Sequence, residues 1–166
     1  MEQDLIRALG HLVLGTRLKR LGDRMQQQTQ IVLASHDIHV PAAQLPLLAA
    51  VDRLGSASIG TLAQVLGVTQ PGITRLVGKL EAAGLLETTQ AKTASPKTAS
   101  PRTDRRIRLI CLTGAGQSLV TRARAAAWPR IESAVADLCG ANPVLPMLTA
   151  LEDALEAKPL AQRTKS

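Results

Sequence analysis

The chain has 166 residues, of which 45% are hydrophobic, so it is long and apolar enough to bury the core of one folded domain. Twenty lysines and arginines against 13 aspartates and glutamates give a net charge of +7, which favours a polyanionic partner such as nucleic acid or an anionic membrane surface. The sequence contains no Phe, no Tyr and one Trp, which excludes modules that read single-stranded nucleic acid by stacking bases on aromatic rings. Two cysteines form neither a disulfide framework nor a Cys-rich zinc site, so we expect a reducing compartment.

The N-terminal segment is predicted to be one long helix over residues 3–34. Leucines and a methionine recur at spacings of three and four in two stripes, which suggests two neighbours for this helix: Leu5, Leu9 and Leu12, then Leu14, Leu18, Leu21 and Met25. The chain starts with acidic and polar residues, and His11 and Arg17 break its first apolar stretches. We therefore expect neither a signal peptide nor a membrane-spanning helix, and a soluble cytoplasmic protein.

Two helix starts are predicted in the next segment. The stretch His36-Asp37-Ile38-His39 interrupts the first helix, and Pro41 suits the first turn of a second helix that ends near Leu54-Gly55. Pro46 is expected to kink that second helix. Ser58 is a predicted cap for a short third helix that ends at Gly67.

A fourth helix follows after a very short connection. Thr69 can cap it, Pro71 fits its first turn, and Gly84 follows its end. Its apolar residues fall on one face: Ile73, Leu76, Val77 and Leu80. The third and fourth helices are therefore predicted to form a helix-turn-helix.

Beyond Gly84 the hydrophobic period changes from 3.6 to 2, which predicts two strands, Leu85–Gln90 and Arg106–Leu112, joined as a hairpin. Residues 85–112 contain six basic and two acidic residues, a net charge of +4 and more than half of the total. Such local concentration is typical of an element that contacts phosphates, and a solvated loop is the alternative interpretation.

The C-terminal part is predicted to be helical. Thr113 can cap a long helical region that runs to Cys139-Gly140 with an interruption at Pro129, and Asn142-Pro143 can start a last helix that ends near Ala157. The apolar residues of this last helix form a heptad-like seam: Val144, Leu148, Leu151 and Leu155. The seam indicates either a subunit interface or packing within the chain.

Helices, a helix-turn-helix, a basic β-hairpin and further helices together make a winged helix-turn-helix in a helical frame. Between residues 38 and 120 the sequence resembles the MarR family of bacterial transcriptional regulators. The motifs that carry the resemblance are Ser58-Ile59-Gly60-Thr61-Leu62-Ala63, Leu66-Gly67-Val68-Thr69, Ile73-Thr74-Arg75-Leu76-Val77, Leu80-Glu81-Ala82-Ala83-Gly84-Leu85-Leu86, Asp104-Arg105-Arg106 and Leu112-Thr113-Gly114-Ala115-Gly116.

The resemblance implies a mainly α-helical fold with a small β-hairpin wing, and a homodimer whose interface is formed by the first and last helices. It divides the chain into an N-terminal dimerisation helix (1–36), a DNA-binding lobe (37–112) and C-terminal dimerisation helices (113–166). Within the lobe, the recognition helix (70–84) would read the major groove and the wing (86–112) would reach the minor groove.

Two features depart from the family pattern. The family usually has a basic residue at the end of the first wing strand, where this chain has Glu87-Thr88-Thr89. The wing tip carries a tandem repeat, Thr93-Ala94-Ser95-Pro96-Lys97 and Thr98-Ala99-Ser100-Pro101-Arg102, and its small residues and prolines predict a mobile tip in the free protein.

The face of the recognition helix opposite its apolar residues supplies the predicted DNA contacts. Arg75 suits a bidentate contact to guanine, with a phosphate contact as the alternative, and Gln70 suits an adenine edge. Thr74 suits a thymine methyl or a phosphate, and Gly72 would let the helix approach DNA closely. Thr69 and Lys79 complete this set.

In the wing, Asp104 lies two residues before Arg106, so its carboxylate can orient the guanidinium for a narrow minor groove. The resemblance assigns Arg106 as the principal wing contact and Arg105 as its accessory. Arg102 completes the predicted wing contacts; with Lys92 and Lys97 it follows a five-residue spacing similar to Ser-Pro-basic repeats that bind A/T-rich minor grooves. A slipped repeat that enlarges a disordered loop is the alternative.

Other chemistries have little support in the sequence. His36 and His39 lack the further ligands of a zinc site, so we expect no metal. Cys111 shares the parity of Ile107 and Leu109 and is predicted to be a small buried hydrophobe, and Cys139 lies at a helix C-terminus, where a thiolate is disfavoured. No phosphate-binding loop, nucleophile elbow, zinc-protease motif or dinucleotide fingerprint is present, so we expect neither an enzyme nor a cofactor.

The sequence thus predicts a dimeric, sequence-specific regulator that binds a pseudo-palindromic duplex, represses transcription and is released by a small organic effector. An effector site would be aliphatic with polar ends such as Arg17, Arg20 or His11. The alternatives are a winged-helix protein-interaction module, and a DNA-binding regulator controlled by redox or metal.

Overall fold

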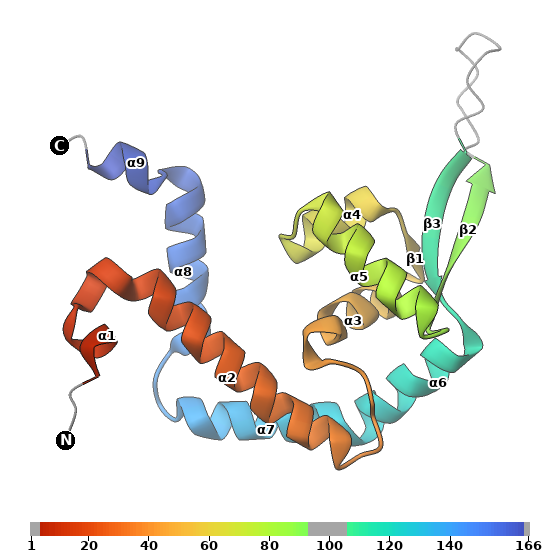
Figure 1. The fold of residues 1–166 in the computed structure, drawn as a ribbon, viewed down its shortest axis with the longest axis horizontal. Helices are drawn as coiled ribbons and strands as arrows, with labels where there is room; N and C mark the ends of the chain where they lie inside the picture. The colour runs from red at the N-terminus through yellow and green to blue at the C-terminus, as the bar shows by residue number, and fades with distance from the viewer. Residues whose placement is uncertain (1–3, 93–105, 165–166) are drawn as a thin grey trace, which may run out of the picture. The chain divides into compact units, whose positions relative to one another are not determined.

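The computed structural model describes residues 4–92 and 106–164. It is mostly helical with a small three-stranded antiparallel sheet, which confirms the predicted fold class. The chain divides into two compact units, Met1–Trp128 and Pro129–Ser166. Figure 1 shows the elements of both units.

The N-terminal segment is not one helix, so the prediction of a continuous helix over residues 3–34 is wrong. It contains α1 (Leu5–Ala8), a 3₁₀ turn (Gly10–Val13) and the long helix α2 (Leu14–Ala34). Gly10 has a φ of +57°, a left-handed conformation that breaks the helix and that glycine adopts without steric cost. The hydrophobic period continues across this break, which is why periodicity alone missed it.

A 3₁₀ turn (Ala42–Gln44) precedes α3 (Leu45–Leu54), and the expected kink at Pro46 is absent. Pro46 lies in the first turn of α3, where backbone N–H groups have no acceptor within the helix and a proline costs nothing. The next element, β1 (Ser56–Ala57), was not predicted, because two residues are too few to show a period.

The predicted helix-turn-helix is confirmed as α4 (Ile59–Leu66) and α5 (Gln70–Ala82). The Ser58 hydroxyl caps α4 by accepting a hydrogen bond from the Thr61 N–H at 3.1 Å. Gly67, with a φ of +61°, ends that helix as predicted.

The recognition helix ends at Ala82, two residues before its predicted end. Gly84 has a φ of +69° and turns the chain, and the N–H of Leu85 donates to the carbonyl of Leu80 at 2.9 Å. The chain then enters the sheet.

The predicted hairpin consists of β2 (Leu86–Lys92) and β3 (Arg106–Leu112), and β3 lies between β2 and β1. The register runs from Leu86 opposite Leu112 to Lys92 opposite Arg106. The first strand starts and ends later than predicted, because Leu85 belongs to the turn after α5.

The hydrophobic core lies in the first unit, between α3, α4, α5, the base of the hairpin and α6. Its fully buried side chains include Leu33, Ile38, Leu47, Leu48, Leu62, Ile73, Leu80, Val51 and Val120. Segments from most of the unit contribute, so the core fixes the recognition helix and the base of the wing relative to each other.

The predicted interruption at Pro129 is present as a change of helix type. Thr113 caps α6 (Gly114–Arg122), a π-helical segment (Ala123–Ala127) follows, and α7 (Trp128–Cys139) carries Pro129 near its start. A π turn shifts the hydrogen-bonding partners of the backbone, which accommodates a residue that has no N–H.

The second unit continues with α8 (Val144–Ala157), close to its predicted bounds, and the short, unpredicted α9 (Leu160–Arg163). Among the described residues, α7, α8 and α9 contain no buried side chain. No single described helix is long and apolar enough to cross a membrane, although Gly114–Cys139 and Val144–Ala157 meet the length and composition requirement as a bent pair.

Candidate nucleic-acid interface

The recognition helix α5 has one buried and one exposed face. Ile73, Val77 and Leu80 are buried and Leu76 is half-buried, as the apolar period predicted. Burial of Ile73, Val77 and Leu80 contributes about 1.5–3 kcal/mol each and fixes the rotation of the helix about its axis. The opposite face is therefore presented to solvent in a defined orientation.

That exposed face carries the predicted contact residues Gln70, Thr74, Arg75 and Lys79. In the described part of the chain, neither Arg75 nor Lys79 forms a side-chain hydrogen bond or an ion pair. The Thr74 hydroxyl donates to the Gln70 carbonyl at 2.9 Å, so its proton is used within the helix and its methyl group remains for an apolar contact. The face presents two unneutralised cations, as binding to an anionic partner requires.

The start of α5 gives Thr69 and Gly72 local roles besides the predicted ones. The Thr69 hydroxyl accepts a hydrogen bond from the Gly72 N–H at 3.3 Å and thereby caps the helix. A Cβ on Gly72 would lie 2.9 Å from Val68 Cγ1 and 3.2 Å from Thr69 Oγ1. Packing within the turn therefore already favours glycine there, independently of any approach to DNA.

The wing is described only in part. Arg102, Asp104 and Arg105 lie outside the described residues, and Arg106 is described by its backbone, opposite Lys92. The predicted Asp104–Arg106 pairing therefore stays a prediction. Arg108, opposite Gln90 in the register, is exposed and adds a cation that the predicted set of contacts did not include. Its alternation with Arg106 along the strand could have indicated it.

The prediction that Cys111 is buried is wrong, because the alternate residues of β3 are the ones that face the core. Ile110 and Leu112 are 2% and 9% exposed and face the core, whereas Leu109 and Cys111 are half-buried on the other face. Arg106 and Arg108 suggested the opposite assignment because they share the parity of Ile110 and Leu112. Arg108 is exposed, since the strand leaves the core before it reaches this residue.

Among the described residues, the other cysteine and the histidines do not form a metal or catalytic site. Cys139 is a free, half-buried thiol. His39 Nε2 lies 3.5 Å from Asp37 Oδ1. Within residues 4–92 and 106–164, no group of three or more His, Cys, Asp or Glu side chains could hold a metal ion.

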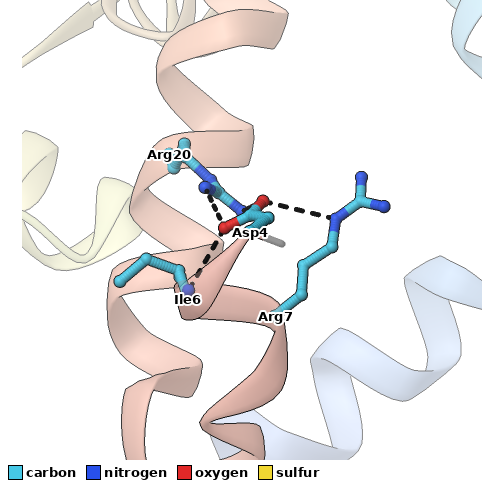
Figure 2. Close-up of polar contacts among 4 residues, drawn as sticks. All are labelled: Asp4, Ile6, Arg7 and Arg20. Carbon is cyan, nitrogen blue, oxygen red and sulfur yellow. Dashed lines mark hydrogen bonds and ion pairs between the residues drawn. The ribbon is translucent and has the colours of Figure 1, made fainter. Parts of the chain in front are cut away.

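Near the N-terminus, α1 is tied to α2 by charged side chains (Figure 2). The Asp4 carboxylate accepts hydrogen bonds from both terminal nitrogens of Arg20, at 3.2 and 3.0 Å, and lies 3.5 Å from Arg7 Nε. It also accepts the N–H of Ile6 and so caps α1. The hydrogen bond to Arg20 is the main reason that the pKa of Asp4 is lowered.

Beside this cluster lies an open hollow of about 280 Å³ with an apolar floor and a basic rim. It is lined by Leu14, Leu18, Leu21, Arg7, Arg17, Arg20 and Arg24. Two of the predicted polar ends of an effector site, Arg17 and Arg20, are thus brought to one place, whereas His11 is not among the lining residues. We call this feature the arginine-rimmed hollow.

A capped helix-turn-helix, a buried stripe behind the exposed helix face and a hairpin that follows directly define a winged helix-turn-helix protein. Residues 38–94 match the sequence model of the MarR family, in agreement with the resemblance seen in the sequence. No curated protein sequence matches the chain.

Solved structures share the winged helix-turn-helix fold of this chain. CouR, a transcriptional repressor bound to a 23-mer DNA duplex, is 24% identical and superimposes with a TM-score of 0.63 over 88% of this chain and 96% of its own. A mutant of MarR from E. coli, complexed with operator DNA, is 19% identical with a TM-score of 0.59 over 87% of this chain and 98% of its own. A MarR family transcriptional regulator from Silicibacter pomeroyi is 23% identical with a TM-score of 0.57, covering 88% and 89%.

Proposed function

We propose that this chain is a sequence-specific regulator of transcription that binds double-stranded DNA as a homodimer. The observation that carries the proposal is the exposed face of α5, where Arg75 and Lys79 are unpaired while the opposite face is locked into the core. Exposed Arg108 adds positive charge on the wing. CouR was solved on a DNA duplex and a mutant of MarR was solved with operator DNA; both share the fold, and this supports the same use of the fold here.

The roles of the individual side chains follow from their chemistry. Arg75 can donate two parallel hydrogen bonds to guanine O6 and N7, and Gln70 can pair with adenine N6 and N7. Thr74 contributes its methyl group to a thymine, since its hydroxyl proton is donated to Gln70. Lys79 lies further along the exposed face of the helix and is assigned a phosphate contact.

The test measures binding of the full-length protein to duplex DNA from its own upstream region and to a scrambled duplex, by fluorescence anisotropy across a salt series. We expect preference for the upstream duplex and a log–log salt slope of about 0.9 per phosphate neutralised. Equal, weak and salt-insensitive binding to both duplexes would refute DNA reading and favour a protein-interaction module.

Substitution separates base reading from general attraction. Arg75→Ala should cost about 1–3 kcal/mol of specific affinity and relax the preference at one operator position. Arg122→Ala is the matched control, since Arg122 is an exposed arginine on α6 and loses the same charge. An unchanged base preference in Arg75→Ala would contradict the assigned contact.

Dimerisation through the N- and C-terminal helices is supported by apolar side chains that the single chain leaves uncovered. Leu5, Leu12 and Leu145 are 67%, 84% and 72% exposed, and Leu151 and Leu155 of the predicted seam are also exposed. Monomeric proteins rarely leave so many large aliphatic side chains open to water. In addition, α8 carries Glu152, Asp153 and Glu156 and no basic residue, which complements the arginines of α2.

Sedimentation equilibrium of the wild type and of the double variant Leu151→Ser/Leu155→Ser tests the dimer. We expect a dimer that the double variant converts to a monomer, because the variant removes apolar surface that would be buried between subunits. A monomeric wild type would refute the proposed dimer.

We propose further that the protein represses transcription by covering its promoter, and that an amphipathic organic anion releases it. The arginine-rimmed hollow combines leucines with guanidinium groups. The guanidinium groups can bind the carboxylate of such a ligand, and the leucines can contact its aliphatic or aromatic part. Because the hollow lies on helices expected at the dimer interface, a ligand that prefers one dimer geometry would shift the population of the DNA-binding form. Octanoate should displace the duplex, and octanol, its uncharged counterpart, should not; release by neither or by both would contradict the charge-based site.

A further inference from the structure

The turn between the recognition helix and the wing is held by more contacts than a simple connection needs. We call residues 81–88 the elbow: the last turn of α5, the turn at Gly84 and the start of β2 (Figure 1). The hydroxyl of Thr113 donates to the Gly84 carbonyl at 2.6 Å, and the Thr113 N–H donates to the Leu85 carbonyl at 3.1 Å. The first turn of α6 therefore anchors the middle of the elbow.

A single side-chain hydrogen bond joins the two ends of the elbow. The Thr88 hydroxyl donates to Oε1 of Glu81 at 2.5 Å, and this bond is partly buried. Glu81 belongs to the last turn of α5 and Thr88 to the middle of β2. A hydroxyl that donates to a carboxylate makes a short, charge-assisted hydrogen bond, which is roughly twice as strong as a neutral one.

The orientation of β2 makes this contact specific to residue 88. Leu86 is buried and Thr88 is half-buried, whereas the alternate residues Glu87 and Thr89 are exposed. Leu86 and Thr88 therefore share the face of the strand that is directed toward the core. On the opposite strand, Ile110 lies beside Thr88 and is only 2% exposed. Thr88 is therefore the point where the wing, on leaving the core, is tied back to the recognition helix.

We propose that Thr88 is a positioning residue for DNA binding: its hydrogen bond to Glu81 sets the direction of the wing relative to the recognition helix. This inference rests on the proposed DNA-binding function and goes beyond it. It also gives a physical reason for the departure at Glu87-Thr88-Thr89. Here a neutral donor holds the carboxylate of Glu81, so this part of the wing has a structural role and makes no contact with phosphate.

The variants are chosen to keep the shape of the side chain. Thr88→Val replaces the hydroxyl by a methyl group and removes the donor, and Thr88→Ser retains the hydroxyl and should restore wild-type behaviour. Thr89→Val is the matched control on the same strand, because Thr89 is exposed and makes only a long hydrogen bond, 3.4 Å, to the Leu109 carbonyl.

In the absence of DNA, amide hydrogen exchange measures whether the wing is held. Thr88→Val should accelerate exchange in β2 and β3 and leave the amides of α3 unchanged, whereas Thr89→Val should have no such effect. Unchanged exchange of the wing in Thr88→Val would overturn the proposal whether or not the protein binds DNA.

With DNA, a double-mutant cycle distinguishes positioning from a general loss of stability. Thr88→Val should weaken binding to the preferred duplex about threefold to tenfold, the range expected for one hydrogen bond. In the double variant with Arg108→Ala, the fold-loss of affinity should be smaller than the product of the two single losses, because the position of the Arg108 side chain depends on the wing direction. In the double variant with Arg75→Ala, on α5, the two fold-losses should simply multiply. If the fold-losses multiply in the double variant with Arg108→Ala just as they do with Arg75→Ala, the positioning role is overturned. Absence of duplex preference in the wild type would instead refute the proposed function, while the exchange result would still decide the elbow contact.

Discussion

Substitution of Gly116 tests the packing of the elbow directly. Gly116 is buried in the first turn of α6, and a Cβ at this position would lie 2.1 Å from the carbonyl oxygen of Leu85 and 3.1 Å from Leu112 Cδ2. Carbon–oxygen contacts are normally at least about 3.3 Å, so the backbone of one element would have to move by more than about 1 Å. Since Leu85 also accepts the hydrogen bond from Thr113, that movement strains or breaks a backbone contact.

The magnitude follows from three contributions. Overpacking costs about 1–3 kcal/mol and a weakened hydrogen bond about 1 kcal/mol, while replacing glycine by alanine in a helix recovers about 1 kcal/mol. We expect Gly116→Ala to lower the free energy of unfolding by about 1–3 kcal/mol, which corresponds to a Tm reduced by about 3–10 °C in a chain of this size.

The matched control is Gly114→Ala, in the same turn of α6, where a Cβ would meet no heavy atom within 4 Å. Urea denaturation followed by circular dichroism, with all proteins at one concentration, compares the midpoints. If Gly116→Ala unfolds at the same urea concentration as Gly114→Ala, the close packing of α6 against the elbow is refuted.

Three further predictions concern caps and charged contacts. Ser58→Ala should destabilise the protein by about 1 kcal/mol through loss of the α4 cap, and an unchanged urea midpoint would contradict this. The pKa of Asp4 is lowered chiefly by its hydrogen bond to Arg20. The attachment of α1 to α2 is therefore complete above about pH 3.9, the ordinary pKa of aspartate, and is lost as the pH falls through the lower pKa of the folded protein. Nuclear magnetic resonance should show this transition in the wild type but not in Asp4→Asn. Arg124 is ion-paired with Asp52, and its guanidinium lies 5.9 Å from the ring centroid of Trp128. Arg124→Ala should therefore change the emission of this single tryptophan while altering stability by less than about 1 kcal/mol, because the Arg124 side chain is largely exposed; unchanged emission would refute the contact.

The sequence predicted the local features that depend on neighbouring residues. Ser58, Thr69 and Thr113 cap helices as expected, because a cap needs one side-chain oxygen and the N–H group three residues later. The buried face of α5 followed from its 3.6-residue period, and the exposed positions of Arg75 and Lys79 followed from that face.

Features that depend on contacts between distant residues were decided by the tertiary structure. The parity of β3 was predicted wrongly because the strand is buried at its end and leaves the core toward the wing, so Ile110 rather than Cys111 faces inward. The two-residue strand β1 exists because β3 offers it a partner, and the bond between Glu81 and Thr88 exists because the elbow brings a helix end to a strand. The hydrophobic period and the caps are properties of the chain itself, whereas pairing, burial and the direction of the wing depend on which surfaces meet.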